Sequence, residues 1–251
     1  MLEDIHRQWF QPSELASGRP EPIVLLHEGL GSVSAWGGFP QDLADATGRQ
    51  VLAYDRLGYG RSGPKPGPWP ARFMHDEAIT LHQVCAAEGL DEVVLVGHSD
   101  GATIALLYPS QAGLRRPRVL VKAIVSLSAH VVVEPICIEA IERLQATYDR
   151  HLSEPLARHH NDAGTAFRLW SDVWISDRFR HWVIEDELAT VTVPVLAIQG
   201  TDDGYGTTQQ LERLAASVSG PSIVHLIDGV DHWPHREAKT ETLRLITSFL
   251  S

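Results

Sequence analysis

The chain has 251 residues, enough for one large domain, and its 43% hydrophobic and 21% charged residues are typical of a globular protein rather than a disordered or fibrous one. Its formal net charge of −11 argues against a general polyanion binder, since phosphate binding needs clustered Lys and Arg. Arg115, Arg116 and Arg118 form the only short basic cluster in the sequence, so we expect no nucleic-acid partner.

The sequence carries no recognisable targeting or membrane-spanning signal. Its start includes Glu3 and Asp4, where a signal peptide would be basic and then apolar, and no apolar run approaches the ~20 residues that span a bilayer. Cys85 and Cys137 form no C-x-x-C pair, so we expect two buried free thiols rather than a metal site or a redox pair. These features predict a cytoplasmic protein with no membrane partner.

Short apolar runs rich in Val, Ile and Leu alternate with helical stretches, which is typical of a parallel sheet covered on both faces. The predicted strands are Ile23–His27, Val51–Tyr54, Val93–Val96, Ala123–Leu127, Val195–Gln199 and Ile223–Ile227. The predicted helices are Phe39–Ala46, Arg72–Glu88, Ala102–Ala112, Thr207–Ser217 and Lys239–Leu250. This alternation predicts right-handed crossovers and a doubly wound α/β fold.

The stretch from His130 to Leu188 interrupts this alternation, because it contains helix-like segments and no convincing strand. We expect a helical insertion over residues 130–188 in a single domain whose core is formed by residues 1–129 and 189–251. Five of its aromatic residues are spaced by three to five positions, namely Phe167, Trp170, Trp174, Phe179 and Trp182. They either pack the insertion onto the core or line a substrate site. The candidate substrate-binding residues are Trp36, His130, Trp170 and Trp174.

The motif with the clearest chemical meaning is Gly97-His98-Ser99-Asp100-Gly101, which lies between a predicted strand and a predicted helix. The chain must turn sharply at the serine, and the two glycines remove Cβ atoms that would collide across that turn. Ser99 is thereby presented at the C-terminal edge of the sheet. A serine hydroxyl in this position is a candidate nucleophile.

A serine nucleophile needs a base to accept its proton and an acid to orient that base. Asp202 and Asp203 follow the strand at Val195, and His232 follows the strand at Ile223. Both positions lie at the C-terminal ends of predicted strands, where parallel sheets gather their active sites. The order Ser, Asp, His along the chain is also the order known for active sites built on such a serine turn between a strand and a helix.

With these residues the chain resembles the α/β-hydrolase superfamily, and within it the group with a helical lid inserted after the sixth strand. The matching segments are His27 to Ser32 with Trp36, Asp55 to Ser62, Gly97 to Gly101, Gly200 to Asp203, and His232. The resemblance covers nearly the whole chain and implies a mostly parallel sheet of about seven or eight strands. Relatives begin with a two-stranded hairpin, and the segment before Ile23 is short for it, so we expect a trimmed or irregular one.

The resemblance assigns Ser99 as nucleophile, His232 as base and Asp203 as acid, because the family acid usually sits three residues after the glycine that ends the seventh strand. Asp202 is the next candidate. Some relatives place the acid after the sixth strand, where Glu134 is a third candidate.

The resemblance also implies an oxyanion hole made by the backbone N–H groups of Asp100 and Gly29, with Leu30 as the alternative to Gly29. The sequence departs from the family at Glu28, which stands where relatives have glycine. The Asp100 side chain either complements the dipole of the following helix or faces the pocket. If both acids face the pocket, they disfavour anionic substrates.

The implied activity is cleavage of an ester-like bond, a carboxylic ester or a lactone, in a small acyl substrate, without a cofactor. Ser99 argues against a dehalogenase or an epoxide hydrolase, which carry Asp at this position. The alternatives are a thioesterase, a hydrolase of C–C bonds in ring-cleavage products, a cofactor-free haloperoxidase or lyase, and a small-molecule receptor that keeps the same residues. We expect a monomer or a homodimer. The histidine pairs His232/His235 and His159/His160 lack the ligand spacing of a zinc site, so we expect no metal.

Overall fold

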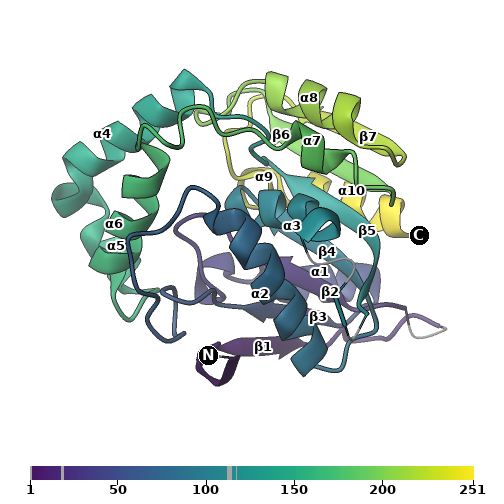
Figure 1. The fold of residues 1–251 in the computed structure, drawn as a ribbon. Helices are drawn as coiled ribbons and strands as arrows, with labels where there is room; N and C mark the ends of the chain where they lie inside the picture. Colours follow the sequence, from purple (N-terminus) through teal and green to yellow (C-terminus); the bar gives the residue numbers. More distant parts are fainter. Residues whose placement is uncertain (1, 18–19, 112–114, 117) are drawn as a thin grey trace.

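The computed structural model describes residues 2–17, 20–111, 115–116 and 118–251. Its centre is a seven-stranded sheet with the order β1-β3-β2-β4-β5-β6-β7 (Figure 1). The strands are β1 (Arg7–Phe10), β2 (Ile23–Leu26), β3 (Val51–Tyr54), β4 (Glu92–His98), β5 (Leu120–Leu127), β6 (Val195–Gly200) and β7 (Ser222–Ile227). Only β1 is antiparallel to its neighbour. The predicted doubly wound, mostly parallel sheet is confirmed.

Helices cover both faces of this sheet. They are α1 (Phe39–Thr47), α2 (Phe73–Ala87), α3 (Asp100–Gln111), α8 (Gln209–Ser217), α9 (Pro234–Glu237) and α10 (Lys239–Leu250), together with the short 3-10 helices η1 (Leu2–Asp4) and η2 (Ser34–Trp36). The helix predicted over 102–112 is α3, and its predicted last residue, Ala112, lies outside the described residues. Across the described residues, no helix has the length and apolarity needed to cross a membrane.

The alternation of side chains along β2 explains why all residues of this strand are apolar. Ile23 and Leu25 pack in one core cluster with Leu43 of α1, whereas Val24 and Leu26 pack in the other cluster with helices α2 and α3. Successive side chains of a strand point to opposite faces, so a strand buried on both faces needs apolar residues throughout.

Strand β1, which occupies four residues of the N-terminal segment before Ile23, was not among the predicted strands. Its four residues pair antiparallel with β3, and Arg7 and Trp9 both hydrogen-bond to the carboxylate of Glu88 beyond α2. The strand is too short and too polar to show an apolar run. The segment therefore supplies one antiparallel strand among its described residues rather than a full hairpin.

Between β5 and β6 the chain is helical, as expected for residues 130–188, and the division into core and insertion stays a prediction. The helices are α4 (Pro135–His151), α5 (Ser153–Ala157), α6 (Ala163–Trp174) and α7 (Glu185–Leu188). An isolated bridge between Val132 and Val183 joins the two ends of the segment. Helices α4, α5 and α6 stand together on one side of the sheet, whereas α7 lies near α8 (Figure 1).

Candidate active site

Ser99 lies in the tight turn between β4 and α3, with a φ of 52° that non-glycine residues rarely adopt. A Cβ atom on Gly97 would lie 2.3 Å from the carbonyl oxygen of Gly101, and one on Gly101 would lie 2.2 Å from that of Leu26. Glycine is therefore required at both positions for the turn to close against strand β2.

The structure brings Ser99, His232 and Asp203 together from three separate loops. His232 Nδ1 lies 2.9 and 3.0 Å from the two carboxylate oxygens of Asp203, and His232 Nε2 lies 2.9 Å from Ser99 Oγ. Because the carboxylate can only accept, Nδ1 carries the proton in the neutral ring, and Nε2 can accept the serine hydroxyl. All three residues are buried.

Asp203 is held in place by several further donors. The N–H groups of Tyr205 and Gly206 donate to its Oδ1, and Gln199 Nε2 donates to its Oδ2 over 3.2 Å. Burial opposes ionisation of Asp203, but the hydrogen bonds from His232 and Tyr205 outweigh it and lower its pKa. The carboxylate is therefore kept charged beside the imidazole.

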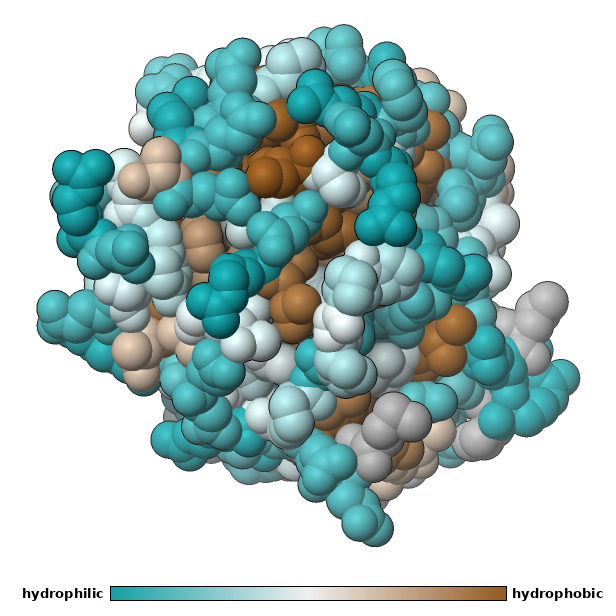
Figure 2. Space-filling view, turned by 60° about the vertical axis from the view of Figure 1, so that its left-hand side comes forward, coloured by the Kyte–Doolittle hydropathy of each residue, from teal (hydrophilic) through white to brown (hydrophobic). Residues whose placement is uncertain are grey.

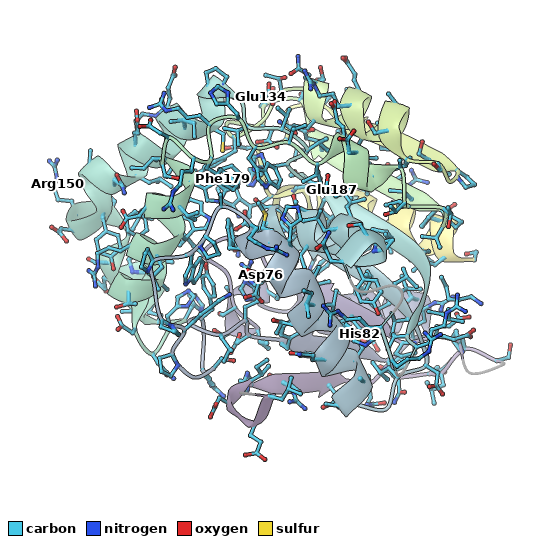
Figure 3. All side chains as sticks on the ribbon, in the orientation of Figure 1. Asp76, His82, Glu134, Arg150, Phe179 and Glu187 are labelled. Carbon is cyan, nitrogen blue, oxygen red and sulfur yellow. The ribbon has the colours of Figure 1, made fainter. Side chains whose placement is uncertain are left out.

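The other two acids considered from the sequence lie elsewhere. Asp202 is exposed and accepts a hydrogen bond from Thr201. Glu134 lies at the start of α4 beside α8 (Figure 3), where its carboxylate accepts hydrogen bonds from Thr207 and Gln210. Glu134 thus ties the start of α4 to α8, and only Asp203 of the three contacts His232.

His98, next to the nucleophile candidate, is a structural hydrogen-bonding residue. Its Nε2 donates to the backbone carbonyl of His232 over 2.7 Å, and its Nδ1 lies 3.7 Å from Glu28 Oε2. Burial lowers the pKa of His98, although Glu28 acts in the opposite direction. The ring therefore fixes the loop that carries His232.

The loop after β2 accommodates Glu28 by folding its side chain back over Gly31. A Cβ atom on Gly31 would lie 2.2 Å from Glu28 Oε2, so the absence of a side chain there makes room for the carboxylate. The Glu28 carbonyl accepts a 2.7 Å hydrogen bond from Arg56 Nη2, which fixes the loop from below. The same loop places Gly29 and Leu30 in the wall of a cavity that Ser99 also lines.

This cavity has a volume of about 270 Å³. Its polar lining residues are Glu28, Ser99, Asp100, His130, His159, Tyr205, His232 and Arg236, and its apolar ones include Leu30, Cys137, Ile141, Leu144, Leu152, Leu156, Trp170, Trp174 and Trp233. Figure 2, which brings forward the side of α4–α6, shows hydrophobic residues gathered in a hollow that hydrophilic residues border. The site is thus a largely apolar pocket with a few charged groups.

Three of the four predicted substrate-binding residues line this cavity, namely His130, Trp170 and Trp174. Burial lowers the pKa of His130 to about 3, so its ring is neutral at physiological pH. Trp36 is placed differently from the prediction. It packs in the core against Phe39 and His235 beneath the site, and its neighbour Ala35 reaches the cavity instead.

The remaining aromatics of the 130–188 segment pack rather than line the site. Phe179 stacks on Trp182 with ring centroids 5.1 Å apart and lies in the interior (Figure 3), and Phe167 stacks on Tyr148. The apolar residues of α4 and α5 that line the cavity were not anticipated. Their only signal in the sequence is their helical spacing, which serves packing equally well.

Asp100 faces the cavity beside Ser99. Burial raises its pKa to about 6, although Arg56, 4.0 Å away, and the nearby indoles of Trp174 and Trp170 favour the charged form. Glu28 and Asp100, the two acids considered near the predicted oxyanion hole, therefore both line the pocket.

The sequence matches the Alpha/beta hydrolase family over residues 23–245. The chain belongs to this family. Epoxide hydrolase A of Mycobacterium tuberculosis is 36% identical over 299 aligned positions, which cover 94% of this α/β hydrolase and 92% of that protein.

Other matches are shorter or show the fold alone. The proline iminopeptidase of Lactobacillus delbrueckii subsp. lactis is 36% identical over 88 residues, which cover 35% of this α/β hydrolase and 30% of that protein. The chain aligns with between 30% and 36% of the length of such iminopeptidases. Among solved structures, that of a Nitrososphaera gargenis carboxylesterase superimposes with a TM-score of 0.75 at 18% identity, covering 98% of this chain and 93% of the other.

Two segments of this α/β hydrolase brace the pocket without lining it. Asp55 accepts hydrogen bonds from the N–H groups of Val33 and Arg61, which fixes the loop under the site. His160 accepts from Gly60 N–H and donates to the carbonyl of Leu30, so it links the 130–188 segment to the loop after β2. Within the described ranges, no three His, Cys, Asp or Glu side chains gather as a metal site.

Proposed function

We propose that this α/β hydrolase cleaves a carboxylic ester or lactone bond in a small, uncharged acyl substrate. Ser99 attacks the carbonyl, His232 accepts its proton, and Asp203 holds the imidazole in the required tautomer. Water then releases the acyl group from the serine. The observation that carries the proposal is the unbroken series of hydrogen bonds from Ser99 Oγ through His232 to Asp203.

The proposed oxyanion hole consists of the backbone N–H groups of Asp100 and Gly29. Asp100 opens α3, where first-turn N–H groups have no acceptor within the helix, and Gly29 lines the same cavity. Two such donors aimed at the developing negative charge lower the barrier to acyl transfer, and each is worth on the order of 10²-fold in rate.

The lining of the cavity favours an uncharged substrate with an apolar portion. Leu144, Leu152 and Leu156 supply an apolar wall, whereas Glu28 and Asp100 would repel an anion. Arg236 is the lining arginine, and its charge is offset by Glu28 at 3.6 Å. A thioester of a phosphorylated carrier would need uncompensated basic residues there.

Epoxide hydrolysis, the activity that names the relative from Mycobacterium tuberculosis, is disfavoured by the chemistry of Ser99. A carboxylate that opens an epoxide forms an ester, which water can cleave. A serine that opens an epoxide would form an ether, which resists hydrolysis, so turnover would stop. Ester cleavage passes through an ester intermediate that water can attack.

The test compares the wild type and Ser99→Ala on p-nitrophenyl esters from acetate to decanoate, followed by a fluorophosphonate probe and intact-mass measurement. We expect hydrolysis and a single label in the wild type, and neither in the variant. A folded wild type that neither hydrolyses an ester nor takes up the probe would refute the proposal.

A further inference from the structure

We infer that Asp100, Trp170 and Trp174 form a subsite that binds a hydroxyl group of the substrate close to the scissile carbonyl, an inference that rests on the proposed function. All three side chains line the cavity that contains Ser99. Their exposed fractions are 1%, 6% and 1%, so each polar group is removed from bulk water.

The polar atoms of these side chains make no hydrogen bond of normal geometry within the described protein, although both indoles lie close enough to Asp100 to favour its charged form and Arg56 Nη1 lies 4.0 Å from its Oδ2. Asp100 Oδ2, Trp170 Nε1 and Trp174 Nε1 are buried and make no hydrogen bond. Most buried polar groups in folded proteins are paired, and leaving one unpaired costs about 1–3 kcal/mol. Three buried polar groups on one cavity wall without a well-formed hydrogen bond therefore indicate that a ligand group completes their hydrogen bonding.

The kinds of atom present select a hydroxyl. Each indole N–H can only donate, and an ionised carboxylate can only accept. A hydroxyl accepts from an indole and donates to Asp100, so it satisfies both. An ammonium group would leave the indoles unpaired, and a carboxylate would be repelled by Asp100.

The subsite adjoins both walls of the proposed oxyanion hole. Asp100 directly follows Ser99, and Trp170 presses its indole nitrogen against the other wall, since a Cβ atom on Gly29 would lie 2.1 Å from Trp170 Nε1. A group bound there is therefore close to the reacting carbonyl. The hydroxyl belongs either to the acyl chain or to the alcohol.

Two ester pairs distinguish these sources. Ethyl 2-hydroxyoctanoate and ethyl 2-methoxyoctanoate vary the acyl side, and 2-hydroxyethyl and 2-methoxyethyl octanoate vary the alcohol side. Within each pair the methoxy ester has similar intrinsic reactivity but cannot donate a hydrogen bond. We expect the wild type to prefer the hydroxyl ester in one pair by at least about tenfold in kcat/KM, measured by pH-stat titration.

The variants are Asp100→Leu, which removes the acceptor, and the double variant Trp170→Phe/Trp174→Phe, which removes both donors. The control is Trp182→Phe, since the Trp182 indole nitrogen is also buried without a partner but does not line the cavity. The readout is the ratio of kcat/KM for the hydroxyl ester to kcat/KM for the methoxy ester, taken within each variant. This ratio does not depend on the overall activity of the variant.

A ratio that falls below about threefold in Asp100→Leu or in the double variant, and persists in Trp182→Phe, supports the subsite. The pair that shows the preference identifies the side of the ester that carries the hydroxyl. Equal rates within both pairs, or a preference that survives both substitutions, overturn the subsite and leave the Ser99 chemistry intact. A folded wild type that hydrolyses p-nitrophenyl esters but none of these four esters overturns the subsite alone, whereas one that hydrolyses neither set and takes up no probe overturns the proposed function as well.

Discussion

Glu28 and Asp100 line the same cavity, but their surroundings move their pKa values in opposite directions. Burial raises the pKa of Asp100 to about 6. For Glu28 burial acts in the same sense, but His98, Arg236 and His235 outweigh it and lower the pKa. The two carboxylates should therefore contribute to folding stability with opposite dependence on pH.

For Asp100, the native state keeps the proton up to about pH 6, whereas the unfolded chain loses it near pH 3.8. The native state thus binds more protons in this window, and its stability falls as pH rises. We therefore expect the unfolding free energy of Asp100→Asn, measured by urea denaturation, to rise relative to that of the wild type by about 2 to 3 kcal/mol as the pH increases from 4 to 7. A difference that stays constant with pH would contradict this assignment.

For Glu28, the unfolded chain takes up a proton near pH 4.5 while the native carboxylate stays charged. Its stabilising contribution is complete above that pH and is lost as pH falls. Glu28→Gln should cost about 1 kcal/mol at pH 7, a modest value because Arg236 is half exposed. The cost should shrink below pH 4.5. A loss of unfolding free energy that grows as the pH falls would contradict this role of Glu28.

Asp203 and its neighbour Asp202 provide a matched pair of acids. Asp203→Asn keeps the size of the side chain but removes the charge that holds His232 in the required tautomer, so kcat should fall by about 10³- to 10⁴-fold. Asp202→Asn should leave kcat within about twofold, because Asp202 is exposed and does not contact His232. Similar losses in both variants would place the orienting acid elsewhere.

The close approach of Ser99, Asp203 and His232 could be predicted because each follows an apolar run, and the carboxyl ends of parallel strands meet at one edge of the sheet. No comparable rule applies to the 130–188 segment. Trp170 and Trp182 are both tryptophans of this segment, but Trp170 lines the cavity and Trp182 packs in the core. Which of them reaches the pocket depends on how the helices dock, and this is set by contacts distant in sequence.

Trp36 illustrates the same limit on a finer scale. The sequence places it in the loop near the oxyanion hole, but a shift of one residue decides whether a side chain faces the pocket or the core. In the structure Ala35 faces the cavity, and the large indole of Trp36 packs against Phe39 and His235 in the core. The role of Glu28 was equally open, because its accommodation depends on the empty space at Gly31.

Gly29 and Gly38 allow a test of the contact between the loop after β2 and Trp170. In Gly29→Ala the new methyl group would lie 2.1 Å from Trp170 Nε1, so the indole and the proposed oxyanion donor must separate. We expect kcat/KM on p-nitrophenyl butyrate to fall at least about tenfold, with the unfolding free energy reduced by about 1 kcal/mol or more. Gly38→Ala is the control, since its Cβ would have only Asp42 nearby, at 3.8 Å, and its φ of −81° suits alanine. Full activity in Gly29→Ala would mean that Trp170 can move away without disturbing the site, and its close packing on Gly29 would then not be needed for catalysis.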